Sequence, residues 1–328
     1  MSPGPVFVTG GSGMLGRRVI AALVADGRTV RALARSGQSS AAVAAAGAEA
    51  IPGDLADLGA IRAGLAGCTS LVHCAARMEN GGPFSAYVAD NLAGTQNLLD
   101  VAAAAGVARF VHVGAAMSLL GGAAVDGADE TWPLHELKCS GYVRTKTLAD
   151  RAVRVAATDE FTTIVIRPAW VWGSPDDPQL LATVGAVRAG RMRLIDHGRH
   201  EIVTSHIDNV VSAIVLALDH GEPGAAYYVF DDAPITIKDF LSGLMHTQGL
   251  DLPSASIPAP VARALAATME TTWKMLRRPG TPPITRLLVA LNSGPFLVSD
   301  QLARTELGYQ PVTARTDGLS RLHAIAPC

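Results

Sequence analysis

The chain has 328 residues and a formal net charge of −2, from 27 lysines and arginines against 29 aspartates and glutamates. Because it shows neither a basic excess nor a block of like charge, we expect neither a nucleic-acid partner nor attachment to an anionic membrane. Hydrophobic residues make up 49% of the chain, enough for a substantial core, yet no apolar run reaches the roughly 18 residues of a membrane span.

The first residues, "MSPGPVFVTG", lack the basic and long apolar regions of a secretory signal. The cysteines, Cys68, Cys74, Cys139 and Cys328, show no CxxC spacing. We therefore expect free thiols in a cytoplasmic protein, because the cytoplasm keeps thiols reduced.

Strand and helix patterns alternate along residues 1–115. Short apolar runs predict strands at 5–9, 29–35, 48–55, 70–76 and 108–115. Helical periodicity that ends on a glycine predicts helices at 14–27 and 88–106. Strands that alternate with helices form parallel βαβ units, so we predict an α/β fold with a Rossmann-type, doubly wound parallel sheet.

The same patterns continue beyond residue 140 and then loosen. A helix is predicted over 142–157 and a strand over 161–168, while a helix at 207–221 and a strand at 225–230 would return to the main sheet. An amphipathic helix followed by a proline-rich turn is predicted within 257–283. We assign 1–173, together with 205–233, to the dinucleotide-binding domain. We assign 174–204 and 234–328 to a smaller, mostly helical C-terminal lobe that covers the substrate.

A glycine-rich turn, "TGGSGMLG", separates the first predicted strand from the first predicted helix. In a dinucleotide site with this spacing, the first glycine makes the tight turn and the second lets backbone approach the pyrophosphate. The third allows close helix–strand packing, and the helix N-terminus offers unpaired N–H groups to the phosphates. The predicted cofactor-binding residues of the turn are Thr9, Gly10, Ser12, Gly13, Met14, Leu15 and Gly16.

The end of the second predicted strand indicates which dinucleotide binds. NAD sites usually place Asp or Glu about 20 residues after the glycines, where it accepts from the ribose 2′-OH. Here the strand ends in "RALARSG", and Arg35 stands in that place. A guanidinium can hold a 2′-phosphate through two charge-assisted hydrogen bonds, so we predict a preference for NADP(H). A merely solvated Arg35 would leave a site that also accepts NAD(H).

The segment "YVRTK" places Tyr142 and Lys146 four residues apart on one helix face. A tyrosine hydroxyl has an ordinary pKa of about 10, and a nearby ammonium lowers that pKa by stabilising the phenolate. The tyrosine could then give a proton to a carbonyl oxygen, or take it back in the oxidative direction. A surface tyrosine packed on a lysine stem would give the same pattern, so the pair by itself is weak evidence.

In combination these segments resemble the extended short-chain dehydrogenase/reductase superfamily. Besides the glycine turn and "YVRTK", the resemblance rests on "GDL" from Gly53, "HCAA" from His73, "NLAGTQNLL" from Asn91, "RPAWVWG" from Arg167, "SHIDNV" from Ser205 and "ELGYQP" from Glu306. It covers essentially the whole chain. The chain is more similar to the 3-beta-hydroxysteroid dehydrogenase and dihydroflavonol reductase branch than to the sugar-nucleotide epimerases.

The resemblance implies roles for residues outside the glycine turn. Asp54 and Leu55 would flank the adenine, and Ala75 and Ala76 would line the path of the ribose and pyrophosphate. A turn residue and strand-end packing are the structural alternatives for these positions.

The nicotinamide end would be bound by two further positions. Lys146 would contact the nicotinamide ribose, and Pro168 would pack near the nicotinamide ring. No metal is expected, since this chemistry needs none and no ligand-like cluster is present. We place three histidines in the core or around the site: His73, His112 and His206.

The sequence departs from the family at one catalytic position. The strand before the tyrosine helix usually delivers a serine or threonine that hydrogen-bonds the substrate oxygen, and that position falls on Ala116. Loss of one such donor costs roughly 10²–10³ in rate. Ser118 would face the same side if the strand continued, so it is the candidate replacement. A backbone N–H or a water molecule is the alternative.

The substrate pocket is expected at the ends of the predicted strands. Its candidates are mostly apolar or aromatic, which favours a hydrophobic substrate: Met78, Glu79, Asn80, Ala116, Met117, Ser118, Leu119, Trp170, Val171 and Trp172. A nucleotide sugar would instead need cations for its diphosphate, and the candidates are Arg188, Arg191, Arg193 and Arg199. The helix with Trp273 and Met275 would close the pocket or contact a second subunit of a homodimer.

Three functions follow from these patterns. The first is an NADP(H)-dependent oxidoreductase that interconverts a hydrophobic ketone or aldehyde and its alcohol, with Tyr142 as proton donor. The second is a nucleotide-sugar epimerase or dehydratase with tightly bound NAD. The third is a non-catalytic dinucleotide-sensing protein, which the missing serine favours and the Tyr–Lys pair disfavours.

Overall fold

The computed structural model describes residues 4–78, 81–121, 124–276, 278 and 280–325. Its centre is a seven-stranded sheet of order β12-β7-β5-β4-β1-β2-β3 in which every neighbouring pair is parallel. This confirms the predicted doubly wound α/β fold. The strands are β1 (Val6–Thr9), β2 (Val30–Ala34), β3 (Glu49–Pro52), β4 (Ser70–His73), β5 (Arg109–Val113), β7 (Thr162–Pro168) and β12 (Ala226–Val229).

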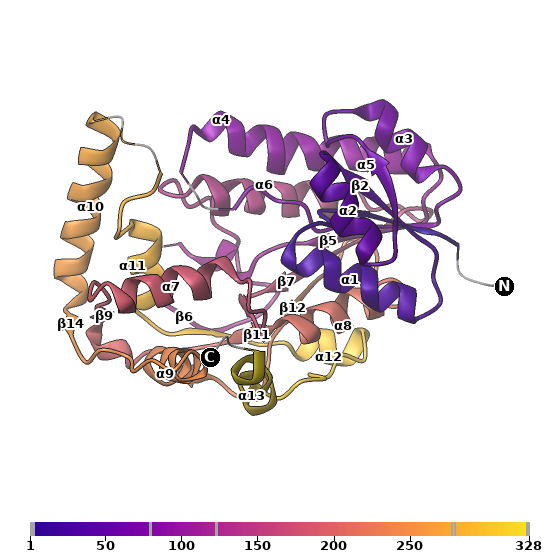
Figure 1. Cartoon of the computed structure of the whole chain (residues 1–328). Coiled ribbons are helices and arrows are strands. Elements are labelled where there is room, and N and C mark those ends of the chain that lie inside the picture. The colour runs from indigo at the N-terminus through magenta and orange to yellow at the C-terminus, as the bar shows by residue number, and fades with distance from the viewer. Residues whose placement is uncertain (1–3, 79–80, 122–123, 277, 279, 326–328) are drawn as a thin grey trace.

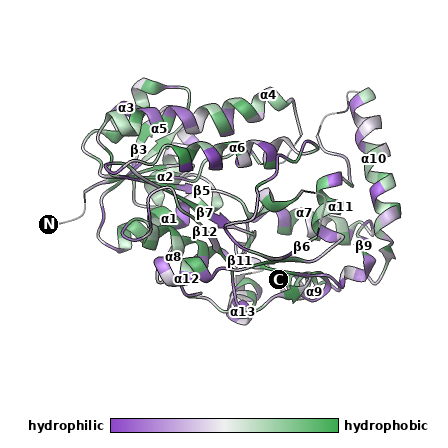
Figure 2. Ribbon diagram, turned by 180° about the vertical axis from the view of Figure 1, so that it is seen from behind, coloured by the Kyte–Doolittle hydropathy of each residue, from purple (hydrophilic) through white to green (hydrophobic). Residues whose placement is uncertain are grey.

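Helices cover both faces of this sheet (Figure 1). One face carries α1 (Met14–Ala25) and α8 (Ile207–Ala217), which pack on each other. The other carries α3 (Leu58–Leu65), α5 (Gly94–Ala104) and α6 (Gly141–Val155), while α2 (Gly37–Ala45) lies beside β2 and β3. The central strands are therefore buried on both faces, which explains why they read as continuous apolar runs. Figure 2 shows this hydrophobic interior in green.

A smaller lobe lies beside the seven-stranded sheet (Figure 1). Its helices are α7 (Pro178–Arg188), α9 (Ile237–Thr247), α10 (Ala259–Met275) and α11 (Arg286–Asn292), and α10 stands at the edge of the molecule in Figure 1. It also holds a four-stranded sheet that the sequence patterns did not predict: β13 (Ile235–Thr236), β10 (Glu201–Ile202), β15 (Phe296–Val298) and β6 (Val125–Ala128). Strand β6 comes from the segment between β5 and α6, so the first half of the chain contributes to the lobe.

Short elements complete the chain. Two further parallel pairs are β8 (Trp170–Trp172) with β11 (Thr204–His206) and, within the smaller lobe, β9 (Leu194–Ile195) with β14 (Ser256–Ile257). The remaining helical elements are α4 (Phe84–Tyr87), the π-helix η1 (Val88–Ala93), the 3₁₀ turns η2 (Ala116–Leu119) and η3 (Asp196–Gly198), α12 (Gln301–Glu306) and α13 (Arg315–Ile325).

A buried carboxylate ties β8, β11 and α8 together. Asp231 accepts hydrogen bonds from Trp172 Nε1 at 2.7 Å and Thr204 Oγ1 at 2.7 Å. It also accepts from Asn209 Nδ2 at 2.8 Å and from the backbone N–H of His206. Because unmade bonds to buried groups are costly, this one side chain fixes the strand that follows β7 relative to the main sheet.

The composition led us to expect free thiols and no membrane-spanning segment. Cys68, Cys74 and Cys139 form no disulfide with one another, and Cys328 lies outside the described residues. Among the helices of the described ranges, none is both long enough and apolar enough to cross a bilayer.

Candidate active site

The glycine turn between β1 and α1 is sterically specified. Gly10 has φ +73°, and a Cβ built there would lie 2.5 Å from the backbone nitrogen of Ala75. A Cβ on Gly16 would collide with the carbonyl oxygen of Gly10. Gly13 differs, because its nearest neighbour would be Gly10 O at 3.3 Å, so it faces space that a dinucleotide phosphate can enter.

The residues of the turn around Gly13 are arranged for a phosphate group. Gly13 is the N-cap of α1 and supplies no side-chain bond to the helix, so the first N–H groups of α1 are not capped by a side chain. Met14 and Leu15 begin the helix and are half-buried. Arg17, which the sequence patterns did not single out, donates to Ser12 O at 2.7 Å and pairs with Asp176. This pair closes one side of the turn.

The strand ends beside this turn position the other predicted cofactor contacts. Cys74 N donates to Thr9 O at 3.0 Å, which brings Ala75 against Gly10. Arg35 is exposed directly after β2, as the sequence predicts.

The predicted adenine-side residues lie after β3. Asp54 is exposed, and its Oδ1 accepts from the N–H of Ala56 at 2.8 Å. Leu55 is half-buried against Gly94, and its carbonyl accepts from Asn97 Nδ2 at 2.8 Å. Asp54 therefore acts as a turn residue, and its exposed side chain still borders the end of the sheet.

Tyr142 and Lys146 lie one turn apart near the start of α6, where Ser140 caps the helix by accepting from Val143 N at 3.1 Å. Both side chains are buried, with exposed fractions of 7% and 3%. Lys146 Nζ donates to the carbonyl of Val113, at the end of β5, and to His112 Nε2 at 3.2 Å. Burial lowers the pKa of Lys146 to about 8, against the opposing charge of Asp150.

The histidines belong to the buried scaffold, as expected. Thr9 Oγ1 donates to His73 Nδ1 at 2.7 Å, and His73 Nε2 donates to Thr95 Oγ1 at 2.9 Å, since that hydroxyl gives its own proton to Asn91 O. Burial, with the nearby Lys146 charge, lowers the pKa of His73 to about 3. His112 is kept neutral by the same two causes, which hold its pKa well below its ordinary value.

Asn91 is a site residue to which the sequence patterns gave no role of its own. It lies in the π-helix η1, and its side chain accepts from Arg77 N at 2.6 Å and donates to Arg77 O at 3.1 Å. Asn91 Nδ2 also donates to Thr145 Oγ1, at 3.0 Å, between Tyr142 and Lys146. It therefore braces the chain after Ala76 against α6. The only signal in the sequence was the segment "NLAGT".

A buried ion pair was also missed. Arg167 donates through Nε and Nη2 to the two oxygens of Asp150, each at 2.8 Å, and both side chains are almost fully buried. Asp150 lies one turn after Lys146 on α6, and Arg167 directly precedes Pro168 at the end of β7. Asp150 holds the pKa of Arg167 above its ordinary value. The pair joins the helix of Tyr142 to the strand end that carries Pro168.

The argument that placed Ser118 by strand alternation is wrong. Strand β5 ends at Val113, and residues 116–119 form the 3₁₀ turn η2. Residues three apart eclipse in a 3₁₀ helix, so Ala116 and Ser118 leave the turn in different directions. Both are buried, and η2 packs on α6. Ser118 Oγ has no hydrogen-bond partner within the described part of the chain.

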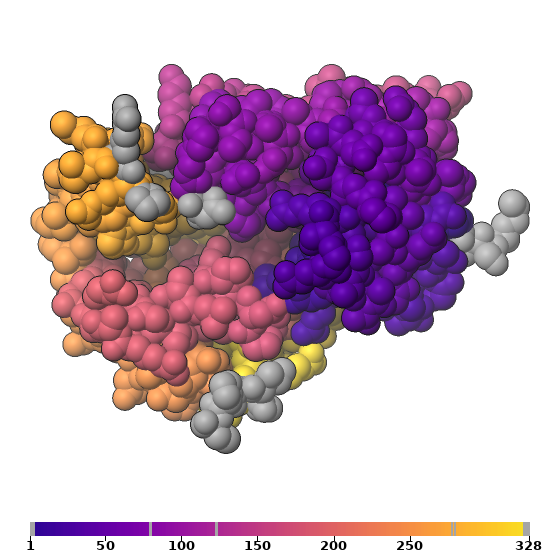
Figure 3. Space-filling view, turned by 45° about the horizontal axis from the view of Figure 1, so that its top comes forward, coloured from indigo at the N-terminus to yellow at the C-terminus, as the bar shows by residue number. Residues whose placement is uncertain are grey.

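A hollow lies between the two lobes, and several of the predicted substrate residues belong to the apolar cluster around Tyr142. Figure 3 shows the surface hollowed between α7, the purple segment around α4 and the orange segment of α10. Ala116, Met117 and Trp170 belong to one apolar cluster with Tyr142, and Met78 is half-exposed. Glu79 and Asn80 lie outside the described residues.

Comparison with known proteins gives concordant matches. Residues 7–259 match the model of the 3-beta hydroxysteroid dehydrogenase/isomerase family. The chain is 37% identical to the 4-hydroxy-2-methyl-3-oxo-4-farnesyl-3,4-dihydroquinoline-1-oxide ketoreductase of Stigmatella aurantiaca, over 98% of this chain and 96% of that one. It is 32% identical to the 2-alkyl-3-oxoalkanoate reductase of Stenotrophomonas maltophilia, over 97% and 98%. Among solved structures, a dTDP-glucose 4,6-dehydratase of Streptomyces venezuelae with NAD bound is 22% identical and has a TM-score of 0.74, over 97% and 95%.

The glycine turn generates a paired prediction. Gly16→Ala should lower the melting temperature and abolish NADPH binding, because its methyl group meets Gly10 O and overpacking typically costs about 1–3 kcal/mol. Gly13→Ala should melt close to the unmutated protein yet raise the Kd for NADPH at least roughly tenfold, about 1.4 kcal/mol. Thermal unfolding and fluorescence titration measure the two effects.

The control is Gly185→Ala on α7, where a Cβ would meet nothing within 4 Å. It should leave NADPH binding unchanged. Unchanged binding in Gly13→Ala would show that phosphate does not approach this glycine.

Proposed function

The chain belongs to the 3-beta hydroxysteroid dehydrogenase/isomerase family, and on this basis we propose that it reduces a hydrophobic ketone with NADP(H), using Tyr142 as proton donor. It is an oxidoreductase that acts on CH–OH and C=O groups, with a nicotinamide dinucleotide as cofactor. The observation that carries the proposal is the buried Tyr142–Lys146 pair on α6, beside the strand ends that meet the glycine turn.

The residues at the strand ends suit a dinucleotide. The turn at Gly13 leaves room for the pyrophosphate, and the uncapped start of α1 provides N–H donors. When bound, the nicotinamide supplies the hydride for the carbonyl carbon. Lys146 and Pro168 would hold its ribose and ring, since both lie at the carboxyl edge of the sheet, where such ligands bind.

The preference for NADP(H) rests on the end of β2. Arg35 is exposed there, and it is followed by Ser36, the N-cap of α2, whose hydroxyl accepts from Ser39 N at 3.2 Å. A guanidinium, two hydroxyls and a helix N-terminus together favour a 2′-phosphate over a bare hydroxyl. Within the described residues, no hydrogen bond or ion pair engages the guanidinium of Arg35.

Proton transfer is assigned to the face of α6. Below its pKa of about 8, Lys146 stays an ammonium at neutral pH, and a positive charge near a phenol favours its ionised form. Tyr142 can then give its proton to the substrate oxygen while Lys146 stabilises the phenolate that remains. Ser118, a buried hydroxyl with no partner in the described residues, is the candidate second donor to that oxygen.

The substrate class is drawn from the relatives and from the apolar walls. The relatives of highest similarity quoted above are named as a ketoreductase and an oxoalkanoate reductase. The cluster around Tyr142 is rich in apolar and aromatic side chains, including Trp170 and Phe240 with ring centroids 5.3 Å apart. These features favour a hydrophobic carbonyl compound over a sugar.

Replacing the proton donor tests the mechanism. Tyr142→Phe should lower kcat for ketone reduction by roughly 10²–10⁴ while the Kd for NADPH stays within about twofold. Tyr227→Phe is the matched control, because that hydroxyl bonds Glu306 at 2.6 Å on the far edge of the sheet. Normal turnover by Tyr142→Phe would refute the proton-donor role.

Removing the positive charge of Arg35, at the end of β2, tests the cofactor preference. Arg35→Ala should weaken NADPH binding by roughly 10–100-fold, the value of a charge-assisted hydrogen bond, and leave NADH binding unchanged. Arg62→Ala, an exposed arginine on α3, serves as the control. Equal binding of NADH and NADPH by the unmutated protein would contradict the preference. NAD retained through gel filtration would support an epimerase or dehydratase instead.

The hydroxyl of Ser118 is tested by moving it. Ser118→Ala should lower kcat by roughly 10²–10³, the cost of one donor to a developing oxyanion. Adding Ala116→Ser to that variant restores the hydroxyl at the family position and should recover activity. A Ser118→Ala enzyme with normal kcat would assign the second hydrogen bond to backbone or water.

A further inference from the structure

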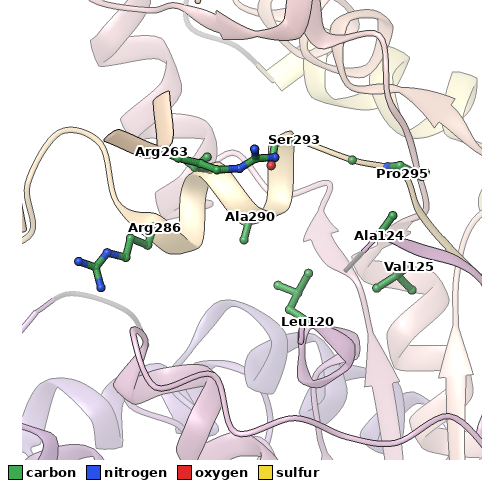
Figure 4. A pocket seen from close by; sticks show the side chains of 10 residues that line it. Leu120, Ala124, Val125, Arg263, Arg286, Ala290, Ser293 and Pro295 are labelled. Carbon is green, nitrogen blue, oxygen red and sulfur yellow. The ribbon is translucent and has the colours of Figure 1, made fainter. Parts of the chain in front are cut away.

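A cavity of about 620 Å³ lies next to the candidate active site, and no step of the proposed reaction uses it. It is bounded by the segment between η2 and β6 on one side and by α10, α11 and the following loop on the other. In Figure 4, Leu120 and Ala290 face each other across the open space, and Arg286 points from the same helix as Ala290. The walls are apolar, and the cavity also has two arginines.

The cavity shares lining residues with the apolar cluster that contains Tyr142. Leu120 follows Ser118 by two residues, and Leu120 and Val125 belong to the same apolar cluster as Tyr142. The cluster also includes Leu287 of α11. A substrate with its carbonyl at Tyr142 and a body too long for the space beside η2 would therefore extend along these side chains toward α11.

Arg286 is oriented by a carboxylate that occupies only one of its edges. Glu270 Oε1 accepts from Arg286 N at 2.7 Å, and Glu270 Oε2 lies 3.5 Å from Nε. The Glu270 side chain is 11% exposed and that of Arg286 is 49% exposed. Within the described ranges, no hydrogen bond or ion pair uses Nη1 or Nη2 of Arg286. Those two nitrogens form a preoriented donor fork.

Arg263 adds a second guanidinium from α10. It is exposed, and no carboxylate of the described residues forms an ion pair with it. Figure 4 shows its side chain extending over α11 toward Ser293. With Arg263, Arg286 and Glu270 counted together, the surroundings of the cavity carry a net charge of +1, which complements a single negative charge.

From these contacts we infer that the cavity is a subsite for the distal part of the substrate, and that the substrate is an amphiphilic ketone with an anionic group. The carbonyl lies at Tyr142, the apolar body lies between Leu120 and Ala290, and a carboxylate lies at Arg286. The inference rests on the proposed carbonyl reduction and specifies its substrate class. Arginines in the lining of an otherwise apolar cavity are not explained by packing, because both side chains are exposed and neither guanidinium fills a gap in the core.

The test compares charged and neutral forms of one compound. Methyl ketones that end in a carboxylate, in a series of increasing chain length, are assayed with NADPH beside their methyl esters. The unmutated protein should show a KM at least roughly tenfold lower for the carboxylates once the chain spans the cavity. Arg286→Ala should raise that KM by roughly 10–100-fold, with the KM for the esters within about twofold and kcat little changed. Arg263→Ala should act in the same direction.

Matched variants separate charge from structure. Arg286→Lys keeps the charge without the fork, so its KM for the carboxylates should lie between those of the unmutated protein and of Arg286→Ala. Lys274→Ala removes a positive charge from the same helix α10, outside the cavity, and should behave like the unmutated protein. Equal KM values for acid and ester, or equal losses for both in Arg286→Ala, would overturn the subsite.

Binding without turnover distinguishes this inference from the proposed reaction. Calorimetry with decanoate and methyl decanoate, on protein saturated with NADP⁺, reports the subsite even if no ketone is reduced. Decanoate binding that is lost in Arg286→Ala would support the subsite. If no ketone were reduced at the same time, the reductase proposal alone would fail. Ester reduction without any preference for carboxylates would refute the subsite alone. Competition by UDP that depends on Arg286 would assign the arginines to a diphosphate and overturn the carboxylate.

Discussion

The ammonium of Lys146 is the charge on which the candidate active site depends. A charged group that is 97% removed from water is strongly disfavoured unless partners replace its hydration. The protein supplies the carbonyl of Val113 and the ring nitrogen of His112, and it places the Asp150 carboxylate one turn away. Burial lowers the pKa of Lys146 to about 8, and the charge of Asp150 acts in the opposite direction. The same burial keeps His112 neutral, so its Nε2 accepts a hydrogen bond from the ammonium and the ring does not repel it.

The partner carboxylate connects the ammonium to the rest of the sheet. Asp150 uses both oxygens on Arg167, so Lys146, Asp150 and Arg167 form a buried series of alternating charge. A buried ion pair contributes little net stability by itself, because desolvation offsets the attraction. Its geometric effect is larger: it fixes the middle of α6 relative to the end of β7. Asn91 fixes the opposite side, because it bonds both the chain after β4 and Thr145 of α6.

The sequence predicted those parts of the fold and site that depend on local patterns. The alternation of β1, α1, β2 and the later strands was readable because buried parallel strands are continuously apolar and helices have a 3.6-residue period. The turn from Gly10 to Gly16 was readable because a Cβ at either of these two glycines would collide with backbone, so glycine is required there.

Other features depend on contacts between distant segments, and no periodicity reveals them. β6 and its partners are two to four residues long and pair only in three dimensions. The Asp150–Arg167 pair joins residues 17 apart on different elements. The π-helix around Asn91 inserts one residue into a pattern that still reads as a helix. The error at Ser118 has the same origin: the end of β5 is set by its neighbours, and the apolar run "FVHVGAA" continues past it.

The segment that carries Ala116 and Ser118 is held from both ends by different sheets. β5 anchors its start in the main sheet, and β6 anchors its end in the small sheet through β15. The path of η2 is therefore set by backbone pairing and by packing on α6, and a hydroxyl at position 116 is not needed to hold it. A chain built in this way can lose the family hydroxyl without losing the shape of the pocket wall. The same anchoring places Leu120 and Val125 opposite α11. The positions of η2 and of the distal cavity are therefore determined by one stretch of backbone.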